Sequence, residues 1–116
     1  MSVKVIKNLV KTELPLLDIP GTKAYLTDLA GSDDAVSPIA AGMFRLEKSN
    51  PLPFTYKYDE MKLVLEGEVT IEDEEGTLHE LVAGDLIHFE TGAKVVFSTP
   101  SSGLMFYVAQ KNIGEL

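Results

Sequence analysis

The stretch that decides the fold runs from Tyr56 to Gly67, with the sequence Tyr-Lys-Tyr-Asp-Glu-Met-Lys-Leu-Val-Leu-Glu-Gly. A second stretch of the same design is Ala83 to Gly92, Ala-Gly-Asp-Leu-Ile-His-Phe-Glu-Thr-Gly. Each places charged or polar residues inside an apolar run and ends at a glycine. Because successive side chains of a strand point to opposite faces, this pattern predicts two strands of one small barrel whose polar side chains point into a shared pocket.

The rest of the chain shows short apolar runs separated by turns that contain glycine or proline, with no helical period. This pattern is typical of an all-β sandwich or barrel. We expect one domain over residues 1–116, with the barrel core at about residues 23–110. The expected strands cover residues 3–10 as a weak edge strand, 23–29, 39–47, 54–65, 68–73, 77–82, 86–89, 94–98 and 104–110, with a turn or bulge at Glu66-Gly67 and a tail at 111–116.

Composition excludes several classes of partner. The 116 residues carry a net charge of −8 and one arginine, Arg45, so there is no basic stripe for nucleic acid or for an anionic membrane surface. No apolar run approaches the roughly 20 residues of a membrane-spanning helix. The absence of cysteine excludes disulfides and thiolate metal sites. We expect a cytoplasmic protein that binds neither nucleic acid nor membrane.

Two spacings resemble the paired motifs of the cupin superfamily: Glu60 followed after six residues by Gly67, and Gly84-Asp85 followed after six residues by Gly92. Within that superfamily, Tyr58-Asp59-Glu60 combined with Phe97-Ser98-Thr99-Pro100-Ser101 resembles the ethanolamine-utilisation protein Q (EutQ-like) cupins. The resemblance covers roughly residues 41–108. It implies an all-β, single-domain cupin jelly-roll barrel, commonly a homodimer, with a small-molecule pocket at its centre.

The chain departs from metal-binding cupins at their ligand positions. Those proteins place two histidines before the first-motif glutamate and one after the second-motif glycine, and these positions fall here near Phe54, near Tyr56 or Thr55, and at Val95. Only Glu60 remains, and one carboxylate does not hold a transition metal. We therefore expect no metal and no cofactor. The long N-terminal extension of the EutQ-like group is not expected here, so its microcompartment or kinase-type roles are not carried over.

The candidate acid and base lie on one strand face. The resemblance implies that Glu60 points into the barrel, and strand alternation then turns Tyr58, Lys62 and Tyr56 the same way. A buried lysine needs a partner, and a Glu60–Lys62 pair could act as acid and base. Tyr58 would orient a substrate oxygen. The alternatives are that Lys62 lies at the barrel mouth with its amine in water, and that Tyr58 only packs in the core.

The second motif adds His88, which shares a face with Leu86, whereas Ile87 and Phe89 form the other face. In cupins this position often lines the pocket, where a histidine could shuttle a proton; a hydrogen-bonded pocket-wall or surface histidine is the alternative. Arg45 would hold a carboxylate if it faced inward, but surface placement is the favoured alternative, and His79 is expected to face solvent. The predicted ligand-binding residues are Tyr56, Phe54, Phe97, Val95, Thr99 and Tyr107.

Three hypotheses follow. The first is a metal-independent cupin that binds a small polar metabolite and catalyses acid/base chemistry of the lyase, dehydratase or isomerase type with Glu60 and Lys62. The second is a non-catalytic ligand-binding or accessory cupin that uses the same pocket. The third is a metalloenzyme that uses Glu60, His88 and tyrosines.

Overall fold

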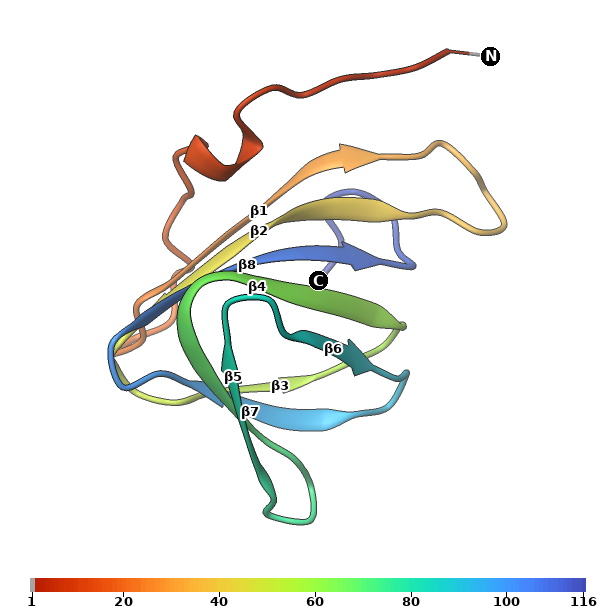
Figure 1. Cartoon of the computed structure of the whole chain (residues 1–116). Helices are drawn as coiled ribbons and strands as arrows, with labels where there is room; N and C mark the ends of the chain where they lie inside the picture. The colour runs from red at the N-terminus through yellow and green to blue at the C-terminus, as the bar shows by residue number, and fades with distance from the viewer. Residues whose placement is uncertain (1) are drawn as a thin grey trace.

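In a computed structural model that describes residues 2–116, the chain folds into two curved antiparallel sheets that face each other (Figure 1). The predicted all-β jelly roll is thus confirmed. The elements are the 3₁₀ turn η1 (Leu9–Lys11) and the strands β1 (Ala24–Gly31), β2 (Ala40–Glu47), β3 (Leu52–Thr55), β4 (Glu60–Glu72), β5 (Leu78–Val82), β6 (Leu86–Phe89), β7 (Lys94–Ser98) and β8 (Ser102–Ala109).

Strand β4 belongs to both sheets. Its first part pairs with β8 and β6, in a sheet that continues through β2 to β1, and its second part pairs with β5 and β7, with β3 at the edge beyond β7. The register against β8 shifts between Val64 and Glu66, and Gly67 has a φ of 74°. The predicted break at Glu66-Gly67 is therefore a bulge inside one bent strand, and the separately predicted strand 68–73 is its continuation.

The core fills the space between the two sheets. Phe44 of β2 meets Phe97 of β7 edge to face, with ring centroids 5.5 Å apart. Val64, Val69 and Met105 are each at most 1% exposed. These apolar contacts set the distance between the sheets and so define the walls of any internal cavity.

Two predicted strands differ from the structure. The predicted edge strand at residues 3–10 is wrong: Asn8 takes a left-handed conformation with a φ of 58°, which ends the extended chain, and η1 follows. The predicted single strand 54–65 is also wrong. It is divided at residues 56–59, where Tyr56 exchanges backbone hydrogen bonds with Ala93 and Gly92, and the chain there passes from one sheet to the other.

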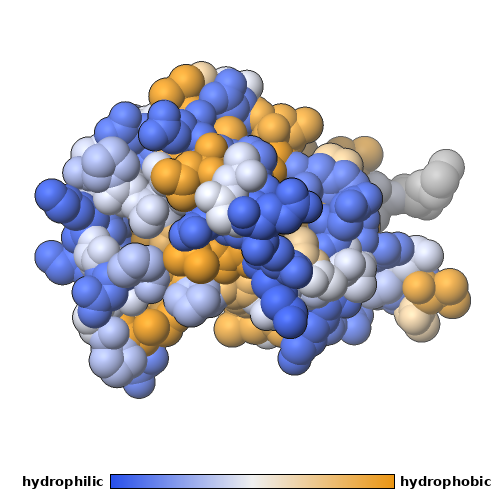
Figure 2. Space-filling view, turned by 90° about the horizontal axis from the view of Figure 1, so that it is seen from below, coloured by the Kyte–Doolittle hydropathy of each residue, from blue (hydrophilic) through white to orange (hydrophobic). Residues whose placement is uncertain are grey.

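Figure 2 shows small apolar patches among mostly hydrophilic residues on the face seen from below. Leu9 and Leu14, from the N-terminal segment, pack with Met43 and Leu104 on the outer side of the β1–β2–β8 sheet. Within residues 2–116, no helix is long and apolar enough to cross a membrane.

Candidate functional site

A cavity of about 270 Å³ lies between the two sheets. Its walls are mainly aliphatic and aromatic, and its charged side chains are Glu60 and Lys62 together with the exposed Asp18. The lining residues are Leu17, Asp18, Ile19, Leu26, Phe44, Leu52, Phe54, Tyr56, Glu60, Lys62, Phe97 and Leu116.

Strand alternation on β4 brings Glu60 and Lys62 to the interior. Glu60 pairs in register with Phe89, and Lys62 pairs with Tyr107 and Ile87. Glu60 is 5% exposed and Lys62 is 3% exposed. The predicted inward orientation of both residues is confirmed, and the alternative that Lys62 lies at the mouth with its amine in water is wrong.

The Glu60 carboxylate contacts its polar partners through one oxygen. Tyr56 donates its phenol hydrogen to Oε2 over 2.6 Å, and the Lys62 ammonium lies 3.0 Å from the same oxygen. Within residues 2–116, no hydrogen bond to Oε1 is formed. Glu60 lines the cavity, so Oε1 is the carboxylate oxygen available to a ligand.

The Lys62 ammonium is enclosed by aromatic rings. Nζ lies 4.4 Å from the ring centroid of Tyr107, 4.8 Å from that of Phe44 and 5.8 Å from that of Phe97. Such cation–π contacts partly replace the hydration that burial removes. Burial lowers the pKa of Lys62, and the neighbouring Glu60 carboxylate opposes this shift.

The two tyrosines before β4 differ in position. Tyr56 stacks on Phe89 with ring centroids 4.5 Å apart, and burial, followed by the nearby Glu60 charge, raises the pKa of Tyr56 far above its ordinary value. Tyr56 is thus a fixed hydrogen-bond donor. Burial also raises the pKa of Tyr58, to about 12. Tyr58 is buried in the core, so its predicted inward orientation is confirmed, and the Glu60 charge adds to the rise of its pKa, but Tyr58 is not on the cavity wall.

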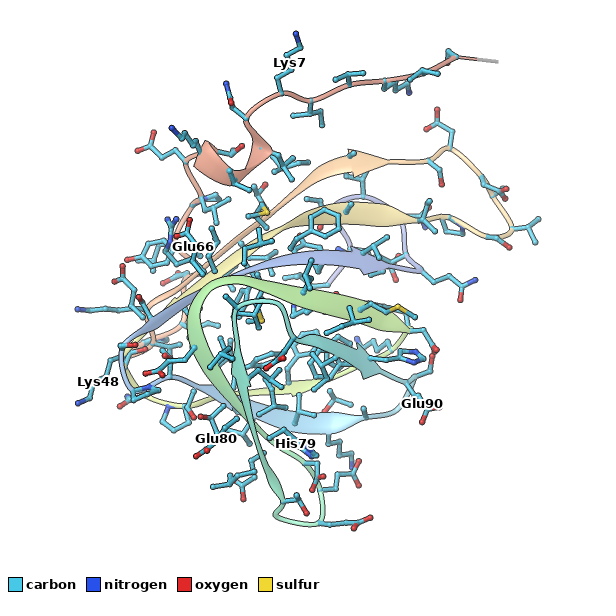
Figure 3. All side chains as sticks on the ribbon, in the orientation of Figure 1. Lys7, Lys48, Glu66, His79, Glu80 and Glu90 are labelled. Atoms are coloured by element: carbon cyan, nitrogen blue, oxygen red, sulfur yellow. The ribbon has the colours of Figure 1, made fainter. Side chains whose placement is uncertain are left out.

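His88 lies outside the barrel, which corrects its predicted place in the pocket. Ile87 packs against the core and Phe89 lies within it, so His88 points outward, 42% exposed, with Nε2 3.0 Å from Asp59 Oδ2. The predicted division into two faces holds, but His88 is on the outer one. His79 is exposed as predicted and is bonded to Asp73 at the tip of the β4–β5 hairpin (Figure 3).

The predicted ligand-binding residues divide into two groups. Phe54, Tyr56 and Phe97 line the cavity. Val95, Thr99 and Tyr107 are buried but are not on its wall.

Each residue of the second group has a structural explanation. The Thr99 hydroxyl donates to the Glu68 carbonyl over 2.7 Å, and Val95 belongs to the core. Tyr107 lies beneath the Lys62 ammonium. Arg45 pairs with Tyr25 on the outer side of the sheet and does not face the cavity.

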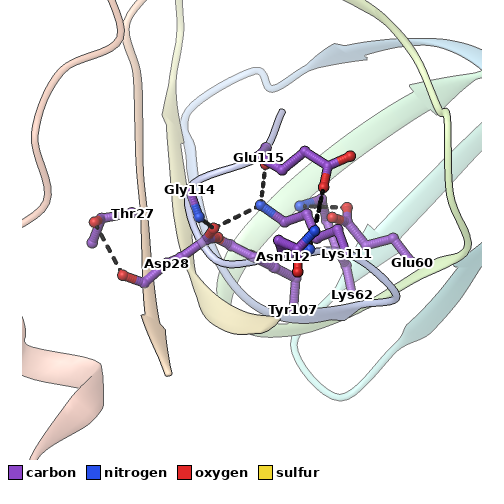
Figure 4. A network of polar contacts seen from close by, with 9 residues as sticks. All are labelled: Thr27, Asp28, Glu60, Lys62, Tyr107, Lys111, Asn112, Gly114 and Glu115. Carbon is purple, nitrogen blue, oxygen red and sulfur yellow. Dashed lines mark hydrogen bonds and ion pairs between the residues drawn. The ribbon is translucent and has the colours of Figure 1, made fainter. Parts of the chain in front are cut away.

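A second buried ion pair, absent from the candidates that the sequence suggests, lies beside the first (Figure 4). Lys111 Nζ is 2.7 Å from Asp28 Oδ2, and the two side chains are 2% and 5% exposed. Tyr107 donates its phenol hydrogen to Asp28. The predicted tail at 111–116 is therefore wrong, because these residues fold back onto the barrel.

Gly42 explains how Tyr107 reaches Asp28. In register, Asp28 of β1 lies opposite Gly42 of β2, and Gly42 lies opposite Tyr107 of β8. A Cβ atom on Gly42 would lie 2.5 Å from the Tyr107 hydroxyl, so only glycine lets the phenol cross β2. A glycine inside a predicted strand often marks such a close approach, and it is the sequence signal that could have pointed to this cluster.

The family model of the ethanolamine utilisation protein EutQ matches residues 1–112. The chain belongs to this family. Over 84 residues it is 40% identical to the acetate kinase EutQ of Escherichia coli K12, an alignment that covers 72% of this chain and 35% of that protein. The chain thus aligns with about a third of the length of the curated relatives it matches.

Solved structures share the fold of this EutQ-family chain. The crystal structure of ethanolamine utilization protein Q from Salmonella typhimurium LT2 is 34% identical, with a TM-score of 0.80 over 93% of this chain and 85% of that chain. The cupin domain of Schizosaccharomyces pombe Cnp3 is 13% identical, with a TM-score of 0.71 over 93% of this chain and 70% of that chain, and shares the fold alone. The resemblance to EutQ-like cupins is confirmed.

The side chains present do not fit the metal site of other cupins. Among residues 2–116, no group of three histidine, cysteine, aspartate or glutamate side chains is placed to hold a metal ion. Glu60 accepts from Lys62 and Tyr56 inside the barrel, while His88 lies outside it. The ligand set of the third hypothesis is therefore not brought together in this EutQ-family barrel.

Proposed function

We propose that this EutQ-family chain binds a small amphipathic metabolite between its sheets and moves a proton on that metabolite with Glu60, without a metal. The observation that carries the proposal is that Glu60, which lines an aromatic cavity of about 270 Å³, has one carboxylate oxygen, Oε1, that accepts no hydrogen bond from residues 2–116.

The cavity chemistry defines the class of ligand. Phe44, Phe54 and Phe97 suit an apolar body, and Oε1 suits one hydroxyl or amine that donates a hydrogen bond. A buried acceptor favours ligands that carry this donor, because an analogue without it leaves the carboxylate oxygen unsatisfied. The proposed metabolite is thus more apolar than the sequence suggested.

Proton transfer would use the same oxygen. Tyr56 and Lys62 both donate to Oε2, which leaves Oε1 to accept a proton from a C–H or O–H group of the ligand. Return of that proton to a neighbouring ligand atom completes an isomerisation. Departure of a hydroxyl or amine that takes up the proton completes an elimination of the lyase or dehydratase type.

Deuterium exchange tests the proton transfer before the substrate is known. The protein is incubated in D₂O with a defined panel of small hydroxy, keto and amino compounds that carry an apolar body, and loss of C–H signals is followed by proton NMR. We expect catalysed exchange in at least one compound, and its loss in Glu60→Gln. Glu66→Gln, an exposed change on the same strand, is the matched control. Equal exchange in Glu60→Gln and the wild type would remove Glu60 from the reaction.

Binding without conversion is the second candidate function. One observation favours it: the Lys62 ammonium is paired with Glu60 and enclosed by rings, which is the arrangement of a satisfied structural ion pair. This candidate predicts that a panel compound binds and that none exchanges deuterium.

Phosphoryl transfer fits the cavity poorly. Phosphate groups are bound by several cationic or backbone donors, whereas the one cation among the lining residues, Lys62, is already paired with Glu60. We expect that ATP does not perturb the cavity. The kinase activity named for the longer relatives is therefore not proposed for this barrel.

We also propose that the chain acts in the cytoplasm as a homodimer. The absence of cysteine suits a reducing compartment. Met61 of β4 and Leu86 of β6 are 42% and 62% exposed on the outer side of neighbouring strands, and exposed apolar side chains of this kind suit a contact with a second copy.

A further inference from the structure

We propose that residues 111–116 form a latch that Asp28 holds across the mouth of the cavity, and that Leu116 limits the size of the ligand. The size limit rests on the proposed function, because it requires that the cavity is the ligand site. The latch itself does not depend on a ligand.

Asp28 is the anchor of this latch. Its Oδ2 accepts from Lys111 Nζ over 2.7 Å and from the backbone N–H of Gly114 over 2.6 Å, and its Oδ1 accepts from the Tyr107 hydroxyl. Two of these three donors belong to the C-terminal segment. Figure 4 shows Asp28, Lys111 and Gly114 converging beside the Glu60–Lys62 pair.

The segment is also closed on itself. Lys111 donates to the Glu115 carbonyl, and the backbone N–H of Asn112 donates to the Glu115 side chain over 3.3 Å. Gly114 has a φ of 84°, a conformation that side chains other than glycine's rarely adopt. These contacts form a compact turn that directs the last residues back toward the barrel.

Strand β1 is shaped to receive this turn. A Cβ atom on Gly31 would lie 2.9 Å from the Cβ of Ile113, so the glycine leaves room for the segment. Lys111 is 3% exposed. Without an ionic partner such as Asp28, its charge would need to remain hydrated. Strand and segment are therefore complementary in both shape and charge.

Leu116 connects the latch to the ligand site. It lines the same cavity as Glu60, together with Leu17 and Ile19 of the N-terminal segment. Because Leu116 remains 59% exposed, it lies at the rim, where its removal widens the mouth without disturbing the core. Loss of the Asp28 anchor would release the whole segment from the rim.

Hydrogen exchange tests the latch without a ligand. In the wild type we expect slow exchange of the Gly114 amide by NMR, and exchange roughly 10- to 100-fold faster in Asp28→Asn, as for loss of hydrogen bonds to a charged group. Lys111→Met is the second variant, since it keeps the long side chain and removes the charge. Asp33→Asn, an exposed change near the end of the same strand, is the control. Equally fast exchange of Gly114 in the wild type and Asp28→Asn would overturn the latch.

A pair of probes tests the size limit. Benzyl alcohol and 2-naphthylmethanol are titrated into the wild type, Leu116→Ala and the matched control Leu78→Ala, whose leucine is 58% exposed on β5. Leu116→Ala should shift the affinity ratio toward the larger alcohol by roughly 10-fold, the discrimination typical of a small change in pocket size. An unchanged ratio would overturn the role of Leu116.

A failure of the proposed ligand class and a failure of the latch give different results. If neither alcohol binds the wild type, the proposed ligand class and the size limit are both contradicted. Slow Gly114 exchange that is lost in Asp28→Asn would then still support the latch.

Discussion

Single side chains decide what the cavity can do, and Lys62 is the clearest case. Its ammonium is buried and has one carboxylate partner, so the two residues form one unit in the energetic sense. Removal of one partner of a buried pair leaves an uncompensated charge, whereas replacement of both by apolar or neutral groups of similar volume often has little effect. The stability of the barrel should therefore depend on the pair rather than on either residue.

We predict that Lys62→Met lowers the free energy of unfolding by about 3–5 kcal/mol, because it leaves the Glu60 carboxylate buried without its cation. The double variant Glu60→Gln/Lys62→Met should recover much of this loss, since the methionine can pack on Phe44 and Tyr107. Urea denaturation of the wild type, both single variants and the double variant measures the coupling. Additive losses would show that the two residues do not act as a pair.

Strand alternation could predict which residues share a face but not always which face is inside. It correctly joined Glu60 with Lys62. It also correctly separated His88 from Phe89. The predicted place of His88 in the pocket was wrong, because the two faces of a four-residue strand are distinguished only by what packs on them. The Asp28–Lys111 pair joins residues 83 positions apart. No local pattern encodes such a contact.

Among the strands, β4 carries the ion pair and bends beyond it to enter the second sheet. Gly67 permits this bend, because its φ is 74° and a Cβ atom there would lie 2.1 Å from the Ser102 carbonyl oxygen. The strand pairs with β8 as far as Gly67 and beyond it pairs with β5 and β7 in the other sheet. The sequence predicted a break at this glycine, but a bulge and a turn share the same residues, so it could not distinguish a bent strand from two strands.

We predict that Gly67→Ala destabilises the fold considerably more than Gly76→Ala does. Both glycines have positive φ, which alone costs about 1–2 kcal/mol for a residue with a Cβ atom. Only at Gly67 would the new Cβ also collide with backbone, whereas nothing lies within 4 Å at Gly76. Thermal unfolding of both variants provides the comparison. Equal losses would mean that the close approach to Ser102 does not constrain the strand.

For the complete barrel, Asp28 should make the free energy of unfolding depend on pH. Burial raises the pKa of Asp28. The hydrogen bonds from Lys111, Tyr107 and Gly114 together lower it by a larger amount, so the net pKa is below the ordinary value. A carboxyl with a depressed folded-state pKa adds stability above its unfolded pKa of about 3.9, and this contribution is lost as the pH falls through the folded-state value.

We therefore predict that the free energy of unfolding falls below about pH 4, and that Asp28→Asn shows a smaller fall because it lacks this titrating group. Urea denaturation from pH 7 down to acid pH measures both curves, with Asp33→Asn as the control. Parallel curves for the wild type and Asp28→Asn would contradict the stabilising role of the ionised Asp28.

The proposed homodimer is also tested on the intact chain. Light scattering should give twice the chain mass of 12.7 kDa, and Leu86→Glu, which introduces a charge on the outer side of β6, should give the monomer mass. Leu78→Glu, on β5, is the control and should remain dimeric. A wild-type mass of one chain would contradict the proposal.

A titration with benzyl alcohol, followed by NMR of ¹³C-labelled leucine methyl groups, tests most directly whether the cavity is a ligand site. We predict that the shift changes concentrate on the lining residues Leu17, Leu26, Leu52 and Leu116, and that Glu60→Gln weakens the binding. Outward leucines such as Leu78 and Leu86 should not respond. Changes confined to those outward leucines, or no change at all, would contradict the account.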